Sequence, residues 1–295
     1  MAARLTLGPL LFNWSADRYR DFYYRIADEA PVDRVCIGEV ICSKRQPFLQ
    51  ECIVSVAERL ERGGKQVVLS SLALPTLERE IRHDWELAGS GRIIEVNDAS
   101  LIPAVKGQTF HVGPFLNVYN EATVEYLARR GARLVALPPE LPTSSILGIA
   151  GARGDVEIEV WAFGRIPLAI SARCYHARAH KLSKDSCQFV CGNDLDGLAV
   201  ETLDDRGFLA INGVQTLSYT YANLIREVAD LADKGVGSFR LSPHTCDMVA
   251  VAQTFSSVLR GNLDCDEAMV RLEELRIGAP FSNGFLRGSA GADYA

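Results

Sequence analysis

Three cysteines stand close together in the stretch SARCYHARAHKLSKDSCQFVC. Cys174, Cys187 and Cys191 give the spacing C-x12-C-x3-C, and His176 and His180 lie between the first two. Thiolates and imidazoles are the usual protein ligands of zinc, and thiolates also hold iron–sulfur clusters. The stretch therefore predicts a metal centre rather than three unrelated loop thiols.

Cys42 is the fourth expected ligand, and it comes from a distant part of the chain. It stands in GEVICSKR, directly after an expected strand. A cysteine at the end of one barrel strand is placed to meet the loop that follows a later strand. Cys36 and Cys52 fall in an expected strand and on the apolar face of an expected helix, where free cysteine is commonly buried. Cys246 and Cys265 stand near expected helix starts, where either could act as a reactive thiol.

The identity of the metal stays open from the spacing alone. Structural zinc usually uses C-x2-C or C-x4-C pairs, of which only one loose match is present, although zinc could also borrow a histidine. A 4Fe–4S cluster takes four thiolates that can be far apart in sequence. Arg173, Arg178 and Lys184 would compensate the negative charge of such a centre. His176 and His180 are expected to be loop residues beside the centre rather than its ligands.

The elements that position these residues alternate between short β-branched runs and helical stretches. Strands are predicted at 34–40, 65–74, 92–98, 110–120, 132–141, 156–170, 208–218 and 238–244, and helices at 48–64, from 75, at 121–131, at 221–235 and up to about 259. Such alternation implies parallel strands with right-handed crossovers. No glycine-rich dinucleotide motif follows the first strand, which weakens the alternative of an open doubly wound sheet. We expect an α/β protein with a (β/α) barrel of the TIM type, complete or incomplete.

The cysteine loop, residues 171–207, replaces one crossover helix of this barrel. We expect one domain over residues 1–288 and a loose tail over 289–295. The chemistry of such a barrel lies at the carboxyl ends of its strands. The polar residues just past expected strand ends are Glu39, Cys42, Asn97, Asp98, Asn117, Asn120, Glu140, Cys174 and His244.

The composition narrows the class of protein. With 295 residues, 48% hydrophobic and 23% charged, the chain has the balance of a soluble globular protein. Its net charge of −6 argues against broad nucleic-acid binding, which needs a basic excess. The N-terminal apolar run is too short for a membrane span, and no other segment approaches that length. We expect a cytoplasmic protein, in which cysteines are thiols or metal ligands rather than disulfides.

Several motifs together resemble the collagenase-like peptidase family U32. They are GEVICSKR, IPLAISARCYHAR, the C-x3-C after KDS, NGVQTL, RLSPH and SNGF, and the resemblance covers nearly the whole chain. It implies a 4Fe–4S cluster held by Cys42, Cys174, Cys187 and Cys191. It further implies a part in the oxygen-independent hydroxylation of the aromatic ring of a ubiquinone precursor. The implied partners are a paralogous UbiU-like protein, as a heterodimer, and a UbiT-like lipid carrier.

The family name suggests proteolysis, but the sequence has neither an H-E-x-x-H zinc helix nor a G-x-S-x-G nucleophile elbow. The resemblance implies prephenate as a hydroxyl donor, whose carboxylates need cationic groups. The predicted substrate-binding residues are Lys44, Arg173, Arg240 and Asn117, and the predicted acid–base residues are Glu39 and Glu140. Two other functions stay open, a non-catalytic scaffold stabilised by its cluster and a zinc-dependent hydrolase.

Overall fold

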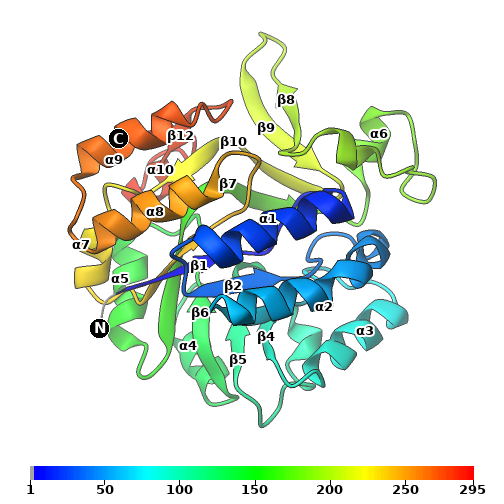
Figure 1. Ribbon diagram of the computed structural model, residues 1–295, viewed down its shortest axis with the longest axis horizontal. Coiled ribbons are helices and arrows are strands. Elements are labelled where there is room, and N and C mark those ends of the chain that lie inside the picture. The colour runs from blue at the N-terminus through cyan, green and yellow to red at the C-terminus, as the bar shows by residue number, and fades with distance from the viewer. Residues whose placement is uncertain (1–2) are drawn as a thin grey trace.

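Eight parallel strands close into a barrel in this computed structural model, which describes residues 3–295 (Figure 1). The strands are β1 (Arg4–Leu7), β2 (Arg34–Ile37), β3 (Gln66–Ser70), β4 (Ile93–Val96), β5 (Phe110–Val112), β6 (Ala132–Ala136), β7 (Glu157–Ile170) and β11 (Ser238–Leu241). Each pairs in parallel with the next, and β11 pairs with both β1 and β7, which closes the ring. The predicted TIM-type barrel is confirmed, and it is complete.

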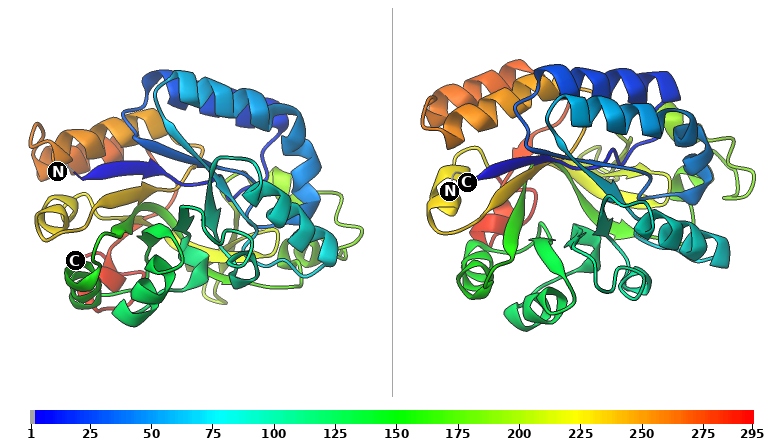
Figure 2. Two further views of the ribbon diagram at one scale, coloured as in Figure 1. Left: turned by 90° about the horizontal axis from the view of Figure 1, so that it is seen from below. Right: turned by 60° about the horizontal axis from the view of Figure 1, so that its bottom comes forward.

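Helices surround the barrel on its outer side (Figure 2). They are α1 (Ala16–Glu29), α2 (Gln46–Arg62), α3 (Glu78–Ala88), α4 (Glu121–Ala128), α5 (Thr143–Ala152), α7 (Val228–Asp233) and α8 (Met248–Leu259). α1 is absent from the predicted elements. The Ser15 hydroxyl caps it by accepting a hydrogen bond from the Arg18 N–H, and Tyr19, Tyr23 and Ile26 form its buried face. A short 3-10 turn, η2 (Ala99–Leu101), stands where a helix would join β4 to β5.

The strand β7 belongs to two sheets. Its first half pairs in parallel with β6 and β11, and its second half pairs antiparallel with β10 (Gln215–Asn223). β10 continues into a meander with β9 (Gly207–Asn212) and β8 (Leu198–Glu201), and β8 and β9 form the hairpin that projects at the top of Figure 1. The single strand predicted at 208–218 is therefore wrong, because a turn at Gly213 divides it into two.

Gly164 makes the passage of β7 from one sheet to the other possible. Its φ of +110° is a conformation that residues with a Cβ rarely adopt, and a Cβ there would lie 2.7 Å from Ser242 Cβ and 2.8 Å from His244 Nε2. We expect Gly164→Ala to lower the free energy of unfolding by about 1–3 kcal/mol, because it adds backbone strain and a collision.

Urea unfolding of Gly164→Ala against Gly151→Ala checks this expectation. Gly151 lies in α5, and a Cβ added there would have no other atom within 4 Å, so its replacement is expected to stabilise by no more than about 1 kcal/mol. Equal midpoints for the two variants would show that β7 does not depend on this glycine.

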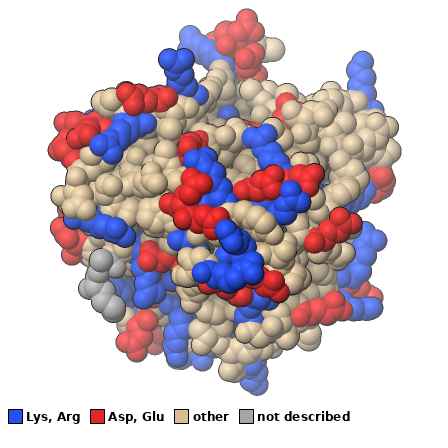
Figure 3. All heavy atoms as spheres, viewed as in Figure 1, with Lys and Arg blue, Asp and Glu red and all other residues tan. Residues whose placement is uncertain are grey.

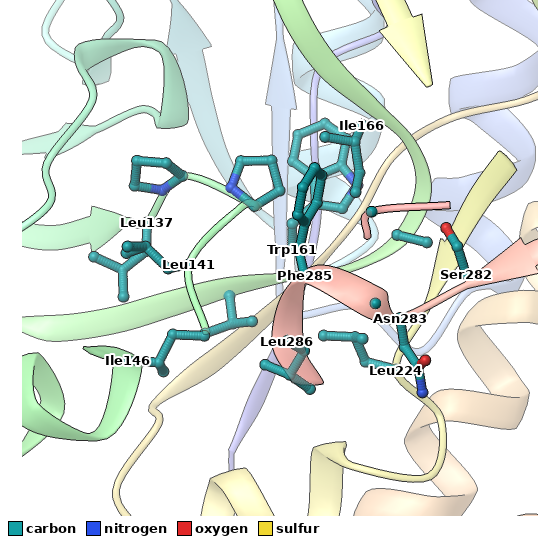
Figure 4. A pocket seen from close by; sticks show the side chains of 16 residues that line it. Leu137, Leu141, Ile146, Trp161, Ile166, Leu224, Ser282, Asn283, Phe285 and Leu286 are labelled. Carbon is teal, nitrogen blue, oxygen red and sulfur yellow. The ribbon is translucent and has the colours of Figure 1, made fainter. Parts of the chain in front are cut away.

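The C-terminal segment packs across the barrel rather than trailing from it. After α9 (Cys265–Glu274) come β12 (Phe281–Ser282), which pairs with β10, and α10 (Gly284–Arg287). Figure 4 shows Phe285 and Leu286 lining an apolar pocket together with Trp161 and Ile166, and the cavity left there is only about 20 Å³.

The tail predicted to be loose beyond residue 288 is hydrogen-bonded back to the fold, so this prediction is wrong. The Asn283 amide donates to the Ala295 carbonyl at 2.9 Å and accepts from the Ala295 N–H at 2.8 Å. The Asn283 N–H donates to the Asp293 carbonyl at 2.9 Å. One buried asparagine thus secures the last turn of the chain.

The surface over α1 and α2 carries acidic and basic side chains interleaved with one another (Figure 3). Several of them form exposed ion pairs, such as Arg20 with Asp17 and Arg59 with Asp28. Pairs of this kind contribute little to stability, and an interleaved face does not present the basic patch that nucleic acid requires. Within residues 3–295, no helix is both long and apolar enough to cross a bilayer.

Candidate metal centre and barrel mouth

All four predicted cysteine ligands line one pocket at the carboxyl end of the barrel. Cys42 follows β2, and Cys174, Cys187 and Cys191 come from the loop after β7. The other residues of the pocket are Lys44, Arg45, Lys184, Phe189, Val190 and Gly213. Two segments more than a hundred residues apart in sequence therefore meet at one group of sulfur atoms, as the barrel topology predicts.

The loop that carries Cys42 is held by Glu39. The Glu39 carboxylate is buried and accepts hydrogen bonds from the N–H groups of Ile41 at 2.8 Å and Cys42 at 2.9 Å. Burial raises the pKa of Glu39, although the nearby Arg45 guanidinium opposes this rise. Because Glu39 Oε1 accepts both of these hydrogen bonds, the geometry gives Glu39 a positioning role, and the predicted role in acid–base catalysis stays a prediction.

Short helices present Cys174 and Cys191 to the pocket, and Cys187 comes from the irregular loop between them. Cys174 caps α6 (Tyr175–Ala179), and its sulfur accepts a hydrogen bond from the Ala177 N–H at 3.4 Å. Cys191 lies in the 3-10 turn η4 (Val190–Asn193), and its carbonyl accepts from the Asn212 amide at 3.0 Å. An N–H group directed at a cysteine sulfur favours the thiolate form, which is the form that binds metals.

Arg45 lies buried beneath the pocket, with only 2% of its surface exposed. Its guanidinium donates to the Leu11 carbonyl at 3.2 Å and to Asn212 Oδ1 at 2.7 Å, and it lies 4.0 Å from Glu39 Oε1. Gly213 allows this approach, since a Cβ there would collide with the guanidinium. The positive charge therefore stays directly under the sulfur atoms.

Neither Arg45 nor Asn212 is among the predicted site residues. The available signal was the SKR that directly follows Cys42, because a basic residue next to an expected thiolate is suited to balance its charge. Asn212 carries no such signal. Its amide joins Arg45, the Cys191 carbonyl and the Asp194 carbonyl only because the β9–β10 turn brings it there.

The spacing of the sulfur atoms distinguishes between a single ion and a cluster. Among the residues that the structure describes, no three cysteine sulfurs lie within 4.8 Å of one another. In a tetrahedral zinc–thiolate site with Zn–S bonds of about 2.3 Å, the sulfurs would be about 3.8 Å apart. A 4Fe–4S cluster separates its thiolates further, because each binds a different iron. The four cysteines as placed thus do not form the compact set of sulfurs that a single zinc ion needs.

The charges around the pocket suit a 4Fe–4S cluster. Lys44, Arg45 and Lys184 all line it, and a cluster held by four thiolates is anionic. Burial raises the pKa of the Cys42 thiol, while the Arg45 guanidinium lowers it. Burial likewise raises the pKa of Cys174, while the Ala177 N–H lowers it. The protein thus supplies cations and N–H groups where thiolates need stabilisation.

Of the predicted cationic substrate ligands, Arg240 is the one that the geometry argues against. It lies inside the barrel with 2% of its surface exposed, and its guanidinium pairs with Glu95 and, at 2.6 Å, with Glu159. No face is left for a substrate carboxylate, because Glu159 of the adjacent strand β7 and Glu95 of the distant strand β4 both meet the guanidinium inside the barrel. Arg240 is a structural residue of the barrel interior.

Lys44 and Arg173 differ in their surroundings. The Lys44 ammonium donates to the Lys184 carbonyl at 2.7 Å and lies 3.3 Å from Asp185 Oδ1, so it holds the cysteine loop against β2. Arg173 is exposed on the same loop. Substrate binding by Arg173 stays a prediction, whereas Lys44 has a structural partner already.

A second hollow at the barrel mouth is lined by two of the predicted site residues, Asn117 and Glu140. This cleft, of about 310 Å³, is lined by Asn117, Tyr119 and Glu140 beside apolar residues that include Phe115 and Leu168. The Tyr119 hydroxyl donates a hydrogen bond to Glu140, and burial together with this carboxylate raises the pKa of Tyr119 to about 12. The phenol therefore keeps its proton at neutral pH. Apolar walls with a few polar groups are typical of small-molecule sites of this size.

The remaining polar residues at strand ends hold the barrel mouth together. His244 Nε2 accepts a hydrogen bond from the Arg165 N–H at 3.0 Å, and its Nδ1 lies 3.3 Å from Asp196. The other three donate to or accept from neighbouring backbone and side chains. They are Asn97 with Ser71 and Glu95, Asp98 with Ser100, and Asn120 with Thr123. These contacts cap turns and helices or join neighbouring strand ends.

Fold and site together define a (β/α)8 barrel whose seventh strand leads into a loop with three cysteines, which meet a fourth at the end of the second strand. Residues 20–292 match the family model of peptidase family U32, and the chain belongs to that family. The solved U32 peptidase Mk0906 is similar to it with a TM-score of 0.47 at 12% sequence identity, over 82% of this chain and 94% of that chain. A chain of the tryptophan synthase complex from Pyrococcus furiosus gives a TM-score of 0.43 at 11% identity, over 94% and 98%.

Proposed function

We propose that this U32 protein is a UbiV-like iron–sulfur subunit of a cytoplasmic hydroxylase that acts on the ring of a ubiquinone precursor without oxygen. The observation that carries the proposal is the meeting of Cys42, Cys174, Cys187 and Cys191 in one pocket over a buried cation. The motifs around these cysteines support the same assignment, since they resemble those of the family members that work in this pathway.

The residues of the chain would hold a 4Fe–4S cluster through the four thiolates. With all four irons ligated by protein, such a cluster supplies electron transfer rather than an open Lewis-acid site. Arg45, Lys44 and Lys184 place positive charge around the thiolates, and the Ala177 N–H donates to the Cys174 sulfur. Charge and hydrogen bonds of this kind set how readily a cluster accepts an electron.

The cleft with Asn117, Tyr119 and Glu140 is where we propose that an aromatic ring binds. Phe115 and Leu168 supply apolar walls, while the Tyr119 and Glu140 pair supplies a proton donor and an acceptor at its edge. Ala73, Phe115 and Ile170 of this cleft pack against the same small apolar cluster as Cys174 and Cys187. The two hollows therefore border one shared apolar cluster, and this proximity suits electron transfer between them.

Analysis of metal and sulfide tests this function. Protein purified without oxygen is expected to contain about four irons and four acid-labile sulfides per chain, with the visible absorption of a cluster. Cys174→Ala is expected to lose both, while Cys265→Ala, a cysteine outside the pocket, is expected to keep them. Zinc without sulfide in the wild-type protein would contradict the proposal.

A second measurement separates a redox subunit from a scaffold. The cluster protein, combined with the UbiU-like partner, a UbiT-like carrier, a ubiquinone precursor and prephenate as the hydroxyl donor, is expected to hydroxylate the ring in the absence of oxygen. A redox subunit must also show a cluster that is reduced and reoxidised while the protein stays folded. Full activity with a cluster that cannot be reduced would assign it a scaffolding role.

A further inference from the structure

A group of nitrogen and oxygen ligands lies next to the cysteine pocket without being part of its lining. His176, His180 and Asp194 offer one ligand atom each, and these atoms all lie within 4.8 Å of one another. His176 belongs to α6, His180 ends that helix, and Asp194 ends η4. The cysteines and their contacts leave this group without a role.

The buried member of the group, His176, has a hydrogen-bond partner at one ring nitrogen and none at the other. Its Nδ1 lies 3.3 Å from the Ile211 carbonyl, and a carbonyl only accepts, so this contact is a hydrogen bond in the tautomer that carries the proton on Nδ1. Its Nε2 is buried and makes no hydrogen bond, although Asp194 Oδ2 lies 3.0 Å away. With Nδ1 protonated, the Nε2 lone pair of a neutral ring faces a carboxylate oxygen, which is unfavourable unless a cation joins them.

His180 repeats this arrangement one helical turn later. Its Nδ1 lies 3.0 Å from the His176 carbonyl, which again places the proton on Nδ1 and leaves Nε2 as an acceptor. The two rings are parallel within 2°, with their centroids 5.3 Å apart. Histidines that bind metals through Nε2 commonly donate Nδ1–H to a backbone carbonyl, which fixes the tautomer and the ring orientation.

The distances suit a single ion. In a tetrahedral site, two ligand atoms about 2.0–2.2 Å from one zinc ion lie about 3.3–3.6 Å apart, and the His176 Nε2 to Asp194 Oδ2 distance of 3.0 Å is a few tenths of an ångström shorter. His180 is exposed, so the third ligand faces solvent and water has access to the ion.

We propose that His176 Nε2, His180 Nε2 and the Asp194 carboxylate bind one divalent transition-metal ion of the zinc type, with at least one position left for water. Nitrogen and oxygen donors distinguish this site from the all-sulfur pocket beside it. The ion joins the end of α6 to the end of η4, and so fixes the two segments that carry Cys174 and Cys191. The site does not depend on the proposed function, because none of its ligands is a cysteine.

Zinc titration of the full-length protein tests this site. The protein is purified without oxygen, treated with a chelator, dialysed, and titrated with zinc chloride in a calorimeter, with iron and sulfide measured before and after. We expect one zinc per chain with no loss of iron. His180→Ala and Asp194→Asn are each expected to weaken binding by more than about 100-fold, because even outer residues of metal sites cost about 10–100-fold.

Two further variants serve as controls for zinc binding at this site. His83→Ala, a histidine of α3 away from the site, is expected to bind zinc as the wild type does. Cys42→Ala is expected to bind it too, whether or not the protein carries a cluster. The proposal is overturned if the wild type binds no zinc, if His180→Ala binds it equally well, or if binding expels iron and disappears in Cys42→Ala.

Discussion

Replacement of Arg240 by methionine is expected to lower the free energy of unfolding by about 3–5 kcal/mol, because it removes the cation paired with buried Glu95 and leaves buried Glu159 with Arg34 alone. Arg240 pairs with Glu95 and Glu159, and both acidic side chains are almost completely buried. Arg206→Met is the matched control, since the Arg206 side chain is 82% exposed and its ion pair lies in solvent. That variant is expected to change stability by less than about 1 kcal/mol.

The pH dependence of this effect identifies its cause. In the wild type, burial raises the pKa of Glu159, but Arg240 and Arg34 together bring it below its ordinary value. Such a carboxylate stabilises the fold above its unfolded pKa, and this contribution is lost as the pH falls through the lower, folded pKa. Without Arg240 the ionised Glu159 carboxylate destabilises the fold. The free energy of unfolding of Arg240→Met therefore recovers in part as this carboxyl group takes up a proton at lower pH.

Urea unfolding at several pH values measures this difference. The gap between the wild type and Arg240→Met is expected to narrow as the pH is lowered from about 8 to about 5. A gap that does not change with pH would mean that lost packing of the long side chain, rather than the unpaired carboxylates, destabilises the variant.

Arg45→Met is expected to lower the free energy of unfolding by a similar amount, about 3–5 kcal/mol, and also to reduce the iron content of the protein. The change leaves Glu39 buried without its nearest cation, and it removes the donor to Asn212 Oδ1 and one of the two donors to the Leu11 carbonyl. It also removes the positive charge that lowers the pKa of Cys42, so the thiolate there becomes less favourable.

Arg45→Lys and Lys44→Met serve as comparisons for this variant. Lysine keeps the charge but cannot reproduce the fork of donors, so an intermediate stability with more retained iron is expected. Lys44 lines the same pocket but is partly exposed, and its loss is expected to cost about 1 kcal/mol. If Arg45→Met and Lys44→Met behave alike in unfolding and in iron content, the buried guanidinium has no special part in the site.

The alternation of strands and helices was sufficient to predict the barrel, because each βα unit carries its own periodicity. The strands β8, β9 and β10, which follow β7 outside the barrel, could not be predicted in the same way. The predicted helix at 221–235 is shortened to Val228–Asp233, because the aromatic and β-branched residues before it continue β10 to Asn223. That strand forms only because β7 offers it an antiparallel partner, and a distant partner leaves no trace in local sequence.

Arg240 shows the same limit at the level of a single residue. Its position near the end of a strand suggested a substrate ligand, and nothing nearby in the sequence indicated its partners. Those partners come from β4 and β7, and they meet it only in the barrel interior. Cys42 was easier to place, because its position after a strand and its scarce residue type both pointed to the cysteine loop.

The division of the four cysteines between β2 and the loop after β7 has a consequence for biosynthesis. The first cysteine leaves the ribosome more than a hundred residues before the others, and β11, which closes the barrel, is made later still. A chain that ends before Cys191 lacks part of the sulfur set, and a chain that ends before β11 carries all four cysteines on a barrel that is still open. Assembly of the cysteine pocket is therefore a late step of synthesis, and an incomplete or misfolded chain does not bring the four sulfur atoms together.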